Sequence, residues 1–153
     1  MHEITRSTIR HIFLSPRPSF PLMTAASLLG MTLKELKQEI EDGAIVAVST
    51  RLGQKVPREE MMAAAMRVWE QGVIEAALGD DAPLVLPEAI RLVELRARVP
   101  RYQRDMLRYL AQRERTTVDR VLTRELEDVA CAHSAELAEA VPGFAAALAW
   151  PGR

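Results

Sequence analysis

Hydrophobic residues recur with helical spacing between positions 25 and 43. Residues 25–29 form a short apolar run that predicts a helix ending at Gly30. Thr32 and Glu35 have the spacing of a capping box, in which both side chains satisfy free N–H groups at the start of a helix. A second helix is therefore expected after Thr32, ending at Gly43.

Short β-branched runs follow this helix. Residues 44–48 and 54–56 predict two strands joined by a turn over residues 49–53. Apolar residues then return to helical spacing, which predicts one helix from Arg58 to Gly79. Helices and hairpin together indicate a small module over residues 22–79.

Two segments next to this module have no clear period. Apolar positions in residues 1–21 fit either a helical stripe or part of a strand, and prolines interrupt the end of the segment. We interpret it as an N-terminal arm. Residues 80–92 begin with Asp80–Asp81 and contain two further prolines, which predicts an extended linker.

Strict alternation of apolar and polar residues begins at Val93 and is typical of a half-buried strand. The apolar positions are Val93, Leu95, Ala97 and Val99, and the polar positions between them are Glu94, Arg96 and Arg98. Such a strand needs a partner, because its edges otherwise leave backbone groups unpaired. The chain offers no obvious second strand nearby, so a second copy is expected to supply it, which makes the protein a homodimer.

Two helices are expected after this strand. Pro100 suits the first turn of a helix over residues 101–113. Thr116 and Thr117 are capping residues for a second helix, whose apolar stripe continues to Val129.

Composition narrows the class of protein. Apolar residues make up 48% and charged residues 27% of 153 residues, as in ordinary globular proteins. The single cysteine, Cys131, indicates a reducing compartment, and neither a membrane span nor an apolar signal-peptide core is recognisable. We therefore expect a cytoplasmic protein.

Charge is distributed unevenly although the net charge is only -1. Residues 91–124 contain ten Arg and four acidic residues, whereas residues 59–90 contain one basic and seven acidic residues. Arginine presents a planar fork that suits phosphate groups and guanine edges. The basic block indicates where a nucleic acid would bind.

The first module resembles the excisionase/MerR-type winged helix-turn-helix. Two helices, a hairpin and the run Val56-Pro57-Arg58-Glu59-Glu60-Met61 carry this resemblance over residues 22–70. It implies that the second helix and the hairpin contact DNA, but that helix carries four acidic residues and two lysines, so a protein contact stays an alternative. The candidate contacts are Lys34, Lys37, Arg51, Lys55 and Arg58.

The strand-helix-helix segment over residues 93–130 resembles a ribbon-helix-helix DNA-binding domain. The resemblance implies a two-chain β-ribbon in the major groove, with Glu94, Arg96 and Arg98 on base edges. The residues implied to contact phosphates are Arg101, Arg104, Arg113, Arg115, Thr116 and Thr117. The family's usual turn glycine is absent, so either the first helix is longer or Arg115 adopts a strained conformation. A ribbon that only dimerises, or an edge strand solubilised by arginines, would show the same pattern.

Taken together, these patterns predict a mainly α protein with short β elements. It would combine a small winged-helix-like module with a ribbon-helix-helix module whose ribbon is formed by two chains. An apolar tail over residues 131–153 follows, and either docks on its own domain or holds a protein partner through Phe144, Leu148 and Trp150.

Sites of catalysis are not recognisable in the sequence. The histidines lie far apart, the single cysteine offers no metal-ligand spacing, and no phosphate-binding loop or nucleophile motif is present. We expect no enzyme, metal or cofactor, and double-stranded DNA as the partner of a dimeric transcriptional regulator. The alternative is an antitoxin or adaptor whose tail or acidic first module binds a protein.

Overall fold

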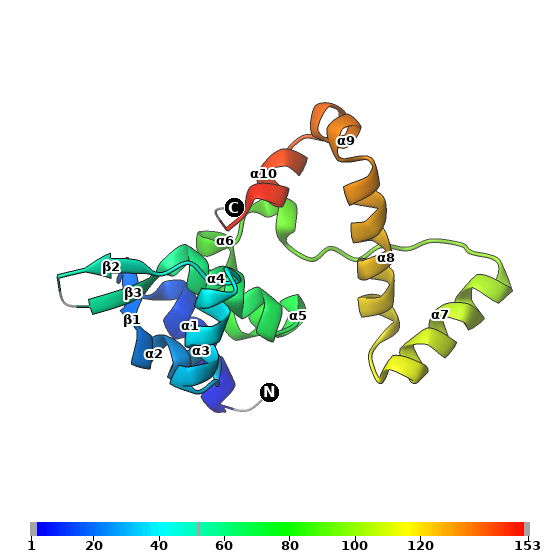
Figure 1. Cartoon of the computed structure of the whole chain (residues 1–153). Helices are drawn as coiled ribbons and strands as arrows, with labels where there is room; N and C mark the ends of the chain where they lie inside the picture. The colour runs from blue at the N-terminus through cyan, green and yellow to red at the C-terminus, as the bar shows by residue number, and fades with distance from the viewer. Residues whose placement is uncertain (1–2, 52, 152–153) are drawn as a thin grey trace. The chain divides into compact units, whose positions relative to one another are not determined.

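The computed structural model describes residues 3–51 and 53–151. The fold is mainly helical, at 68%, with a small three-stranded antiparallel sheet, as the sequence predicts (Figure 1). The chain divides into two compact units, which we describe separately. Unit 1 contains the residues up to Leu92 and those from Ala146 onward, and unit 2 contains Val93–Ala145.

Unit 1 is built from helices around one small sheet. Its helices are α1 (Glu3–Leu14), α2 (Leu22–Leu29), α3 (Leu33–Glu41), α4 (Arg58–Val68), α5 (Gln71–Leu78) and α6 (Ala82–Val85), and α10 (Phe144–Ala149) crosses its boundary. Its strands are β1 (Ser19–Pro21), β2 (Val48–Thr50) and β3 (Gly53–Pro57). The strand order is β1-β3-β2, with Phe20 paired to Val56 and Ser49 paired to Gln54.

The segment interpreted as an N-terminal arm belongs to the core of unit 1. Helix α1 buries Ile9, Ile12 and Phe13 completely, and β1 joins the sheet through Phe20, which is also buried. The helical alternative for the apolar stripe was therefore the right one. The prolines before Leu22 do not exclude a strand, because β1 is an edge strand of only three residues.

The predicted helix pair lies between β1 and the hairpin. Gly30 ends α2 in a left-handed conformation (φ 70°) that a residue with a Cβ adopts only at a cost. The capping box at α3 is confirmed: the Glu35 backbone N–H donates to Thr32 Oγ1 (3.2 Å), and the Thr32 N–H donates to Glu35 Oε2 (2.6 Å). Strand β2 begins four residues later than predicted, whereas β3 begins one residue earlier and ends one residue later.

The single helix expected from Arg58 to Gly79 is wrong, because Trp69 is extended (φ -118°, ψ 144°) and separates α4 from α5. The break lets α5 pack against α1 and bury Ile74 and Leu78. Arg10 of α1 holds this arrangement, since its guanidinium donates to the Leu78 carbonyl (2.9 Å) and pairs with Asp81 (2.5 Å).

The predicted linker over residues 80–92 is also part of unit 1. It contains short helical turns over Gly79–Asp81 and Glu88–Ile90 on either side of α6. Ala82 and Leu86 are buried in the core, which explains why this segment is folded rather than extended.

Unit 2 has a much smaller core. Residues 92–100 have no assigned secondary structure, and α7 (Arg101–Glu114), α8 (Val118–Ala132) and α9 (Ser134–Ala140) follow. Helices α7 and α8 pack against each other, with Ala111 and Val121 buried between them. The helix boundaries lie within a few residues of those expected.

Candidate nucleic-acid interface

The extended segment over residues 93–99 is exposed on both of its sides. Its apolar side chains include Val93, 86% exposed, and Leu95, 68% exposed. Within this fully described segment no residue pairs with another strand of the chain. Within the chain, the segment therefore lacks the partner strand that the predicted alternation requires.

The polar side of this segment carries an ion pair between two of the predicted base-reading residues. The Arg96 Nε and Nη2 donate to Glu94 Oε1 (3.1 Å) and Oε2 (3.2 Å), respectively. Both side chains are largely exposed, at 85% and 73%. Arg98, two residues further along, is exposed as well. The structure thus places all three residues on one exposed strand-like segment.

The start of this segment is fixed by unit 1. The Leu92 backbone N–H donates to Glu75 Oε1 (2.7 Å), and Gln71 Nε2 donates to the same oxygen (3.0 Å) and to the Ile90 carbonyl. At the other end, Pro100 has no N–H and begins helix α7. Free backbone groups therefore extend over residues 93–99.

The turn between α7 and α8 resolves the question raised by the missing glycine. Arg115 adopts the left-handed conformation (φ 54°, ψ 42°), and it is the only non-glycine residue with positive φ among those described. The Thr116 N–H then reaches the Ala111 carbonyl (2.9 Å), which closes the helix end. Thr117 caps α8 by accepting from the Arg120 N–H (3.2 Å). The first turn of α8 presents N–H groups suited to an anion.

The arginines predicted to contact phosphates are exposed, and several have acidic neighbours. Arg101 and Arg104 lie 3.7 and 2.8 Å from Asp105, and Arg113 lies 3.3 Å from Glu114 with its guanidinium 6.0 Å from the centre of the Tyr109 ring. Exposed pairs of this kind contribute little to stability.

One charged contact of unit 2 was not predicted from sequence. Arg124 of α8 donates to Glu114 at the end of α7 (2.7 Å). This hydrogen bond lowers the pKa of Glu114 below its ordinary value and raises the pKa of Arg124. Glu114 and Arg124 are ten residues apart, so they do not have the three- or four-residue spacing of a pair within one helix. They meet because the turn at Arg115 brings α7 and α8 together.

The apolar surface of unit 2 is mostly uncovered. Among residues 93–145, all of which the structure describes, only Ala111 and Val121 are buried. The large apolar residues left exposed are Val93, Leu95, Val99, Tyr102, Met106, Tyr109, Leu126, Val129 and Val141. Exposed apolar surface of this extent is typical of interaction sites.

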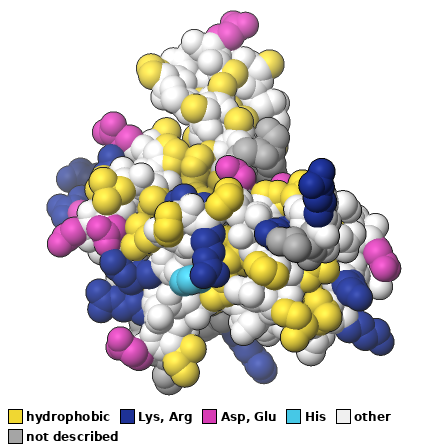
Figure 2. Space-filling model, turned by 90° about the vertical axis from the view of Figure 1, so that its left-hand side faces the viewer, with side chains coloured by type: hydrophobic (Ala, Val, Ile, Leu, Met, Phe, Trp, Pro, Cys, Tyr) yellow, Lys and Arg dark blue, Asp and Glu magenta, His cyan; other side chains and the backbone are white. Residues whose placement is uncertain are grey.

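In unit 1, the lysines of α3 lie on a surface with mixed charge. Lys34 and Lys37 line a shallow hollow together with Gln38 and Glu41. Glu35 is held in the capping box, where hydrogen bonds from Thr32 lower its pKa. Figure 2 shows Lys and Arg side chains separated by acidic and hydrophobic ones on the face viewed, so no continuous basic patch forms there.

The other three residues of unit 1 that were predicted to contact DNA differ in how exposed their side chains are. Arg51 is exposed in the hairpin turn and Lys55 is half-buried on β3. Arg58 is used inside the unit, because its guanidinium donates to the Phe13 carbonyl while its backbone N–H donates to the Pro18 carbonyl (2.9 Å). Arg58 therefore positions α1 and is removed from the candidate DNA contacts.

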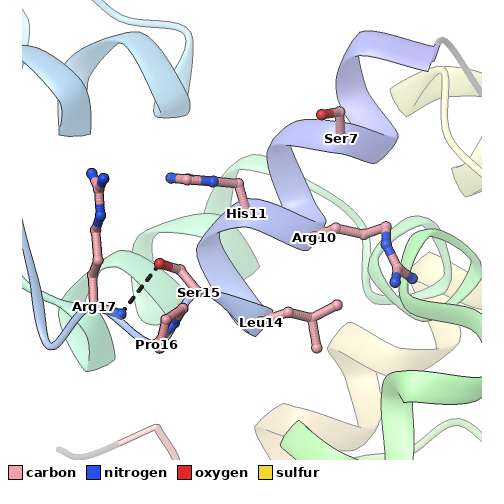
Figure 3. Close-up of a pocket in the computed structure, with 7 residues that line it drawn as sticks. All are labelled: Ser7, Arg10, His11, Leu14, Ser15, Pro16 and Arg17. Atoms are coloured by element: carbon pink, nitrogen blue, oxygen red, sulfur yellow. Dashed lines mark hydrogen bonds between the residues drawn. The ribbon is translucent and has the colours of Figure 1, made fainter.

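A surface hollow at the end of α1 is lined by polar and basic residues. Figure 3 shows that Arg10 points away from His11 and Arg17, so these basic groups do not converge on one point. Arg10 pairs with Asp81, and the His11 ring packs edge-on against Phe20 with centroids 5.8 Å apart. The hollow has a structural explanation and lacks the geometry of an anion site.

The tail residues predicted to bind a partner do not form one exposed surface. Trp150 packs against the core of unit 1, and Pro151 is buried. Phe144 is half-buried, and Leu148 is 45% exposed. The end of the tail docks on its own chain, which was one of the two expected alternatives.

Residues 3–51 and 53–151 contain no group of three or more His, Cys, Asp or Glu side chains placed to hold a metal ion. No helix in these ranges has the length and hydropathy needed to cross a membrane. Comparison of the chain with known protein families, curated proteins and solved structures finds no match.

Proposed function

We propose that the protein is a dimeric, sequence-specific DNA-binding transcriptional regulator of the ribbon-helix-helix type. The observation that carries this proposal is the incomplete state of unit 2: an exposed, alternating segment with free backbone groups precedes two helices that bury only Ala111 and Val121. A second copy of the same unit supplies what is missing, and the outward side of the resulting ribbon carries Arg96 and Arg98.

Energetics support the second copy. Burial of a valine side chain contributes about 1.5–3 kcal/mol, whereas ordering one residue of backbone costs roughly 1–2 kcal/mol. Two buried side chains are too few to hold a strand and two helices in place. Pairing with a second copy would cover Leu95 and Val99 and satisfy the backbone groups of residues 93–99 at the same time.

The ends of the segment favour one pairing register. The Leu92 N–H already donates to Glu75 and Pro100 has no N–H, so residues 93–99 are the ones whose backbone groups can pair with a second copy. Antiparallel two-fold pairing of the whole segment is centred on Arg96 and sets Glu94 opposite the partner subunit's Arg98. A slip by one residue would turn the arginines toward the apolar side.

DNA reading follows from the side chains on the outer side of the ribbon. A two-stranded ribbon fits the major groove, where arginine pairs bidentately with guanine and a carboxylate accepts from cytosine. The phosphate contacts would come from the first turn of α8 and the arginines of α7. Unit 1, with its helix-turn-helix order and mixed charge at α3, would serve as a second DNA contact or as a protein-contact module.

An adaptor role for the tail receives less support. Trp150 and Pro151 already pack on unit 1, so a partner that gripped them would first have to displace them. Leu148 alone offers little apolar surface to a protein. We therefore assign the end of the tail a structural role, and we assign the protein no catalytic activity, metal or cofactor.

Binding of the full chain to the DNA upstream of its own gene tests this proposal. Fluorescence anisotropy at roughly 50 and 200 mM salt should show a steep loss of affinity, about 1000-fold if six or more phosphates are contacted. Replacing Arg96 and Arg98 by Ala should each cost about 1–3 kcal/mol against that site and little against a scrambled duplex. Unchanged binding by the double variant would contradict groove reading, and a monomer at micromolar concentration would contradict the two-chain ribbon.

The register is tested by disulfide trapping in a Cys131→Ser background. Arg96→Cys lies opposite itself across the two-fold axis and should form a cross-linked dimer under mild oxidation. Arg98→Cys is the matched control, because it lies opposite position 94 and should cross-link poorly. The reverse pattern would show a different register.

A further inference from the structure

The Glu94–Arg96 pair uses one particular edge of the guanidinium. The carboxylate accepts from Nε and Nη2 of Arg96, at 3.1 and 3.2 Å. A guanidinium has five N–H donors in a planar fork, and this contact occupies the side that faces back toward the chain. The far end, with one N–H on each terminal nitrogen, stays free and points along the side chain.

This free end is the part of arginine that recognises guanine. Two parallel N–H groups match the O6 and N7 acceptors of guanine in the major groove. We propose that Glu94 is a positioning residue, which holds the Arg96 guanidinium with its two-donor end outward and so makes Arg96 the guanine-selective reader of the segment. The inference rests on the proposed function, because it concerns how the ribbon reads a base.

Arg98 provides an internal comparison. It has the same side chain, two residues further on, and it is also exposed. No ion pair or hydrogen bond of its side chain occurs within the described ranges 3–51 and 53–151. In the proposed register Arg98 lies opposite the partner subunit's Glu94, whose two carboxylate oxygens already accept from the partner's Arg96, so Arg98 stays the less restrained of the two arginines. A less restrained arginine has many rotamers and contacts phosphates and bases alike, whereas an oriented one loses less freedom when it pairs with a base. We therefore expect Arg96 to contribute selectivity, and Arg98 mainly affinity.

Glu94 has opposite effects on affinity and on selectivity. Its negative charge repels DNA phosphates, so it weakens binding to any duplex. Its hydrogen bonds fix Arg96, so they strengthen binding to the correct base only. A residue with a merely structural role would change both kinds of binding in the same direction. This opposition of sign makes the assignment testable.

The experiment compares Glu94→Gln with the wild-type full chain on defined duplexes. The preferred duplex is first selected by the wild-type chain from a randomised DNA pool. Each guanine in it is then replaced in turn by 7-deazaguanine, which lacks the N7 acceptor, and a scrambled duplex serves as the non-specific probe. The wild-type chain should lose about 10-fold in affinity at one guanine position.

In Glu94→Gln, that loss should shrink to roughly 3-fold or less, while affinity for the scrambled duplex rises by about 2-fold or more. Glu127→Gln, an exposed glutamate of α8, is the matched control for loss of one negative charge and should leave the guanine preference unchanged. Arg96→Lys should abolish the same guanine preference, because lysine offers a point charge instead of a fork. Sedimentation of each variant checks that the dimer is intact.

The two failures are distinguishable. If the wild-type chain selects no sequence from the pool, the proposed function fails, and this inference fails with it. If the wild-type chain selects a guanine-containing site and Glu94→Gln retains the full preference at every guanine, only the positioning role of Glu94 is overturned. The positioning role would also be overturned if Arg98→Lys abolished the guanine preference and Arg96→Lys did not.

Discussion

The two units of this chain solve the problem of burial in different ways. Unit 1 buries large apolar side chains from most of its helices and from its sheet, among them Phe13, Phe20, Leu36 and Met61. Unit 2 buries only Ala111 and Val121 and leaves its apolar strand side and much of both helices exposed. Unit 1 therefore encloses a core within a single chain, whereas unit 2 leaves most of its large apolar side chains exposed.

This difference shows that exposed apolar surface can be as informative as a buried core. Unit 1 covers its core with residues of its own chain. In the proposed dimer, a second copy would cover the exposed apolar side chains of unit 2, and the exposed polar side chains would then form a symmetric surface suited to duplex DNA. Four predictions follow the contrast between a self-sufficient unit and an incomplete one.

The largest effect is expected in the core of unit 1. Phe13→Ala removes a fully buried aromatic side chain and should lower the free energy of unfolding by about 3–5 kcal/mol. Thermal unfolding followed by circular dichroism measures this loss, and the size of the loss should not depend on protein concentration. A concentration-dependent effect would show that the unit 1 core also depends on the dimer.

The next effect concerns the apolar side of the segment in unit 2. Leu95→Glu would bury a charge between the two copies, at a cost of at least about 3 kcal/mol to dimer formation. Sedimentation velocity should show a monomer at micromolar concentration, whereas Arg98→Ala on the opposite side should stay dimeric. Dimers of Leu95→Glu would mean that this side chain does not lie in the interface.

A smaller effect, of the opposite sign, is expected at the turn of unit 2. Arg115 has positive φ, which costs a residue with a Cβ about 1–2 kcal/mol, part of which a glycine loses again through chain entropy. Arg115→Gly should therefore raise the stability of the α7–α8 pair by roughly 0.5–1 kcal/mol, measured by thermal unfolding. Arg115→Lys keeps the Cβ and the charge, and should not raise stability. The glycine variant should also lose DNA affinity if Arg115 contacts a phosphate.

The smallest effect is the pH dependence of the Glu114–Arg124 pair. The hydrogen bond from Arg124 lowers the pKa of Glu114 in the folded chain, so its contribution to stability is present above the ordinary glutamate pKa of about 4.3. That contribution is lost as pH falls through the lower, folded value. Glu114→Gln should melt slightly below wild type at pH 7, and the difference should vanish near pH 3. A difference that persists at pH 3 would point to packing as its cause.

Local signals in the sequence predicted much of this fold. The capping box at Thr32 and Glu35, the stop at Gly30 and the two helices after Pro100 each depend on residues a few positions apart, and the structure contains all of them. Features that depend on distant residues were not predictable. Helix α1 was ambiguous because its stripe becomes meaningful only against α5, and the break at Trp69 is favoured by packing rather than by a helix-breaking residue.

In the candidate site, too, features that depend on neighbouring residues were predictable and features that depend on side-chain conformation or on distant residues were not. Alternation placed Glu94, Arg96 and Arg98 on one side of a strand-like segment, and the structure has them exposed on that segment. The sequence did not indicate that Glu94 and Arg96 form a two-point contact, because rotamers decide this. It also did not separate Arg58 from the other cations, since only the tertiary fold brings the Phe13 carbonyl to its guanidinium.

The return of the tail to unit 1 has a consequence for folding. Because Leu92 is held by Glu75 and Trp150 packs on the same core, residues 93–145 form a closed loop rather than a free-ended chain. Closing a loop restricts the conformations open to it before any of its own contacts form. Folding of unit 1 therefore removes part of the entropy that unit 2 would otherwise lose in forming the proposed dimer. A chain truncated before Ala146 should associate more weakly although residues 93–99 and helices α7, α8 and α9 are intact.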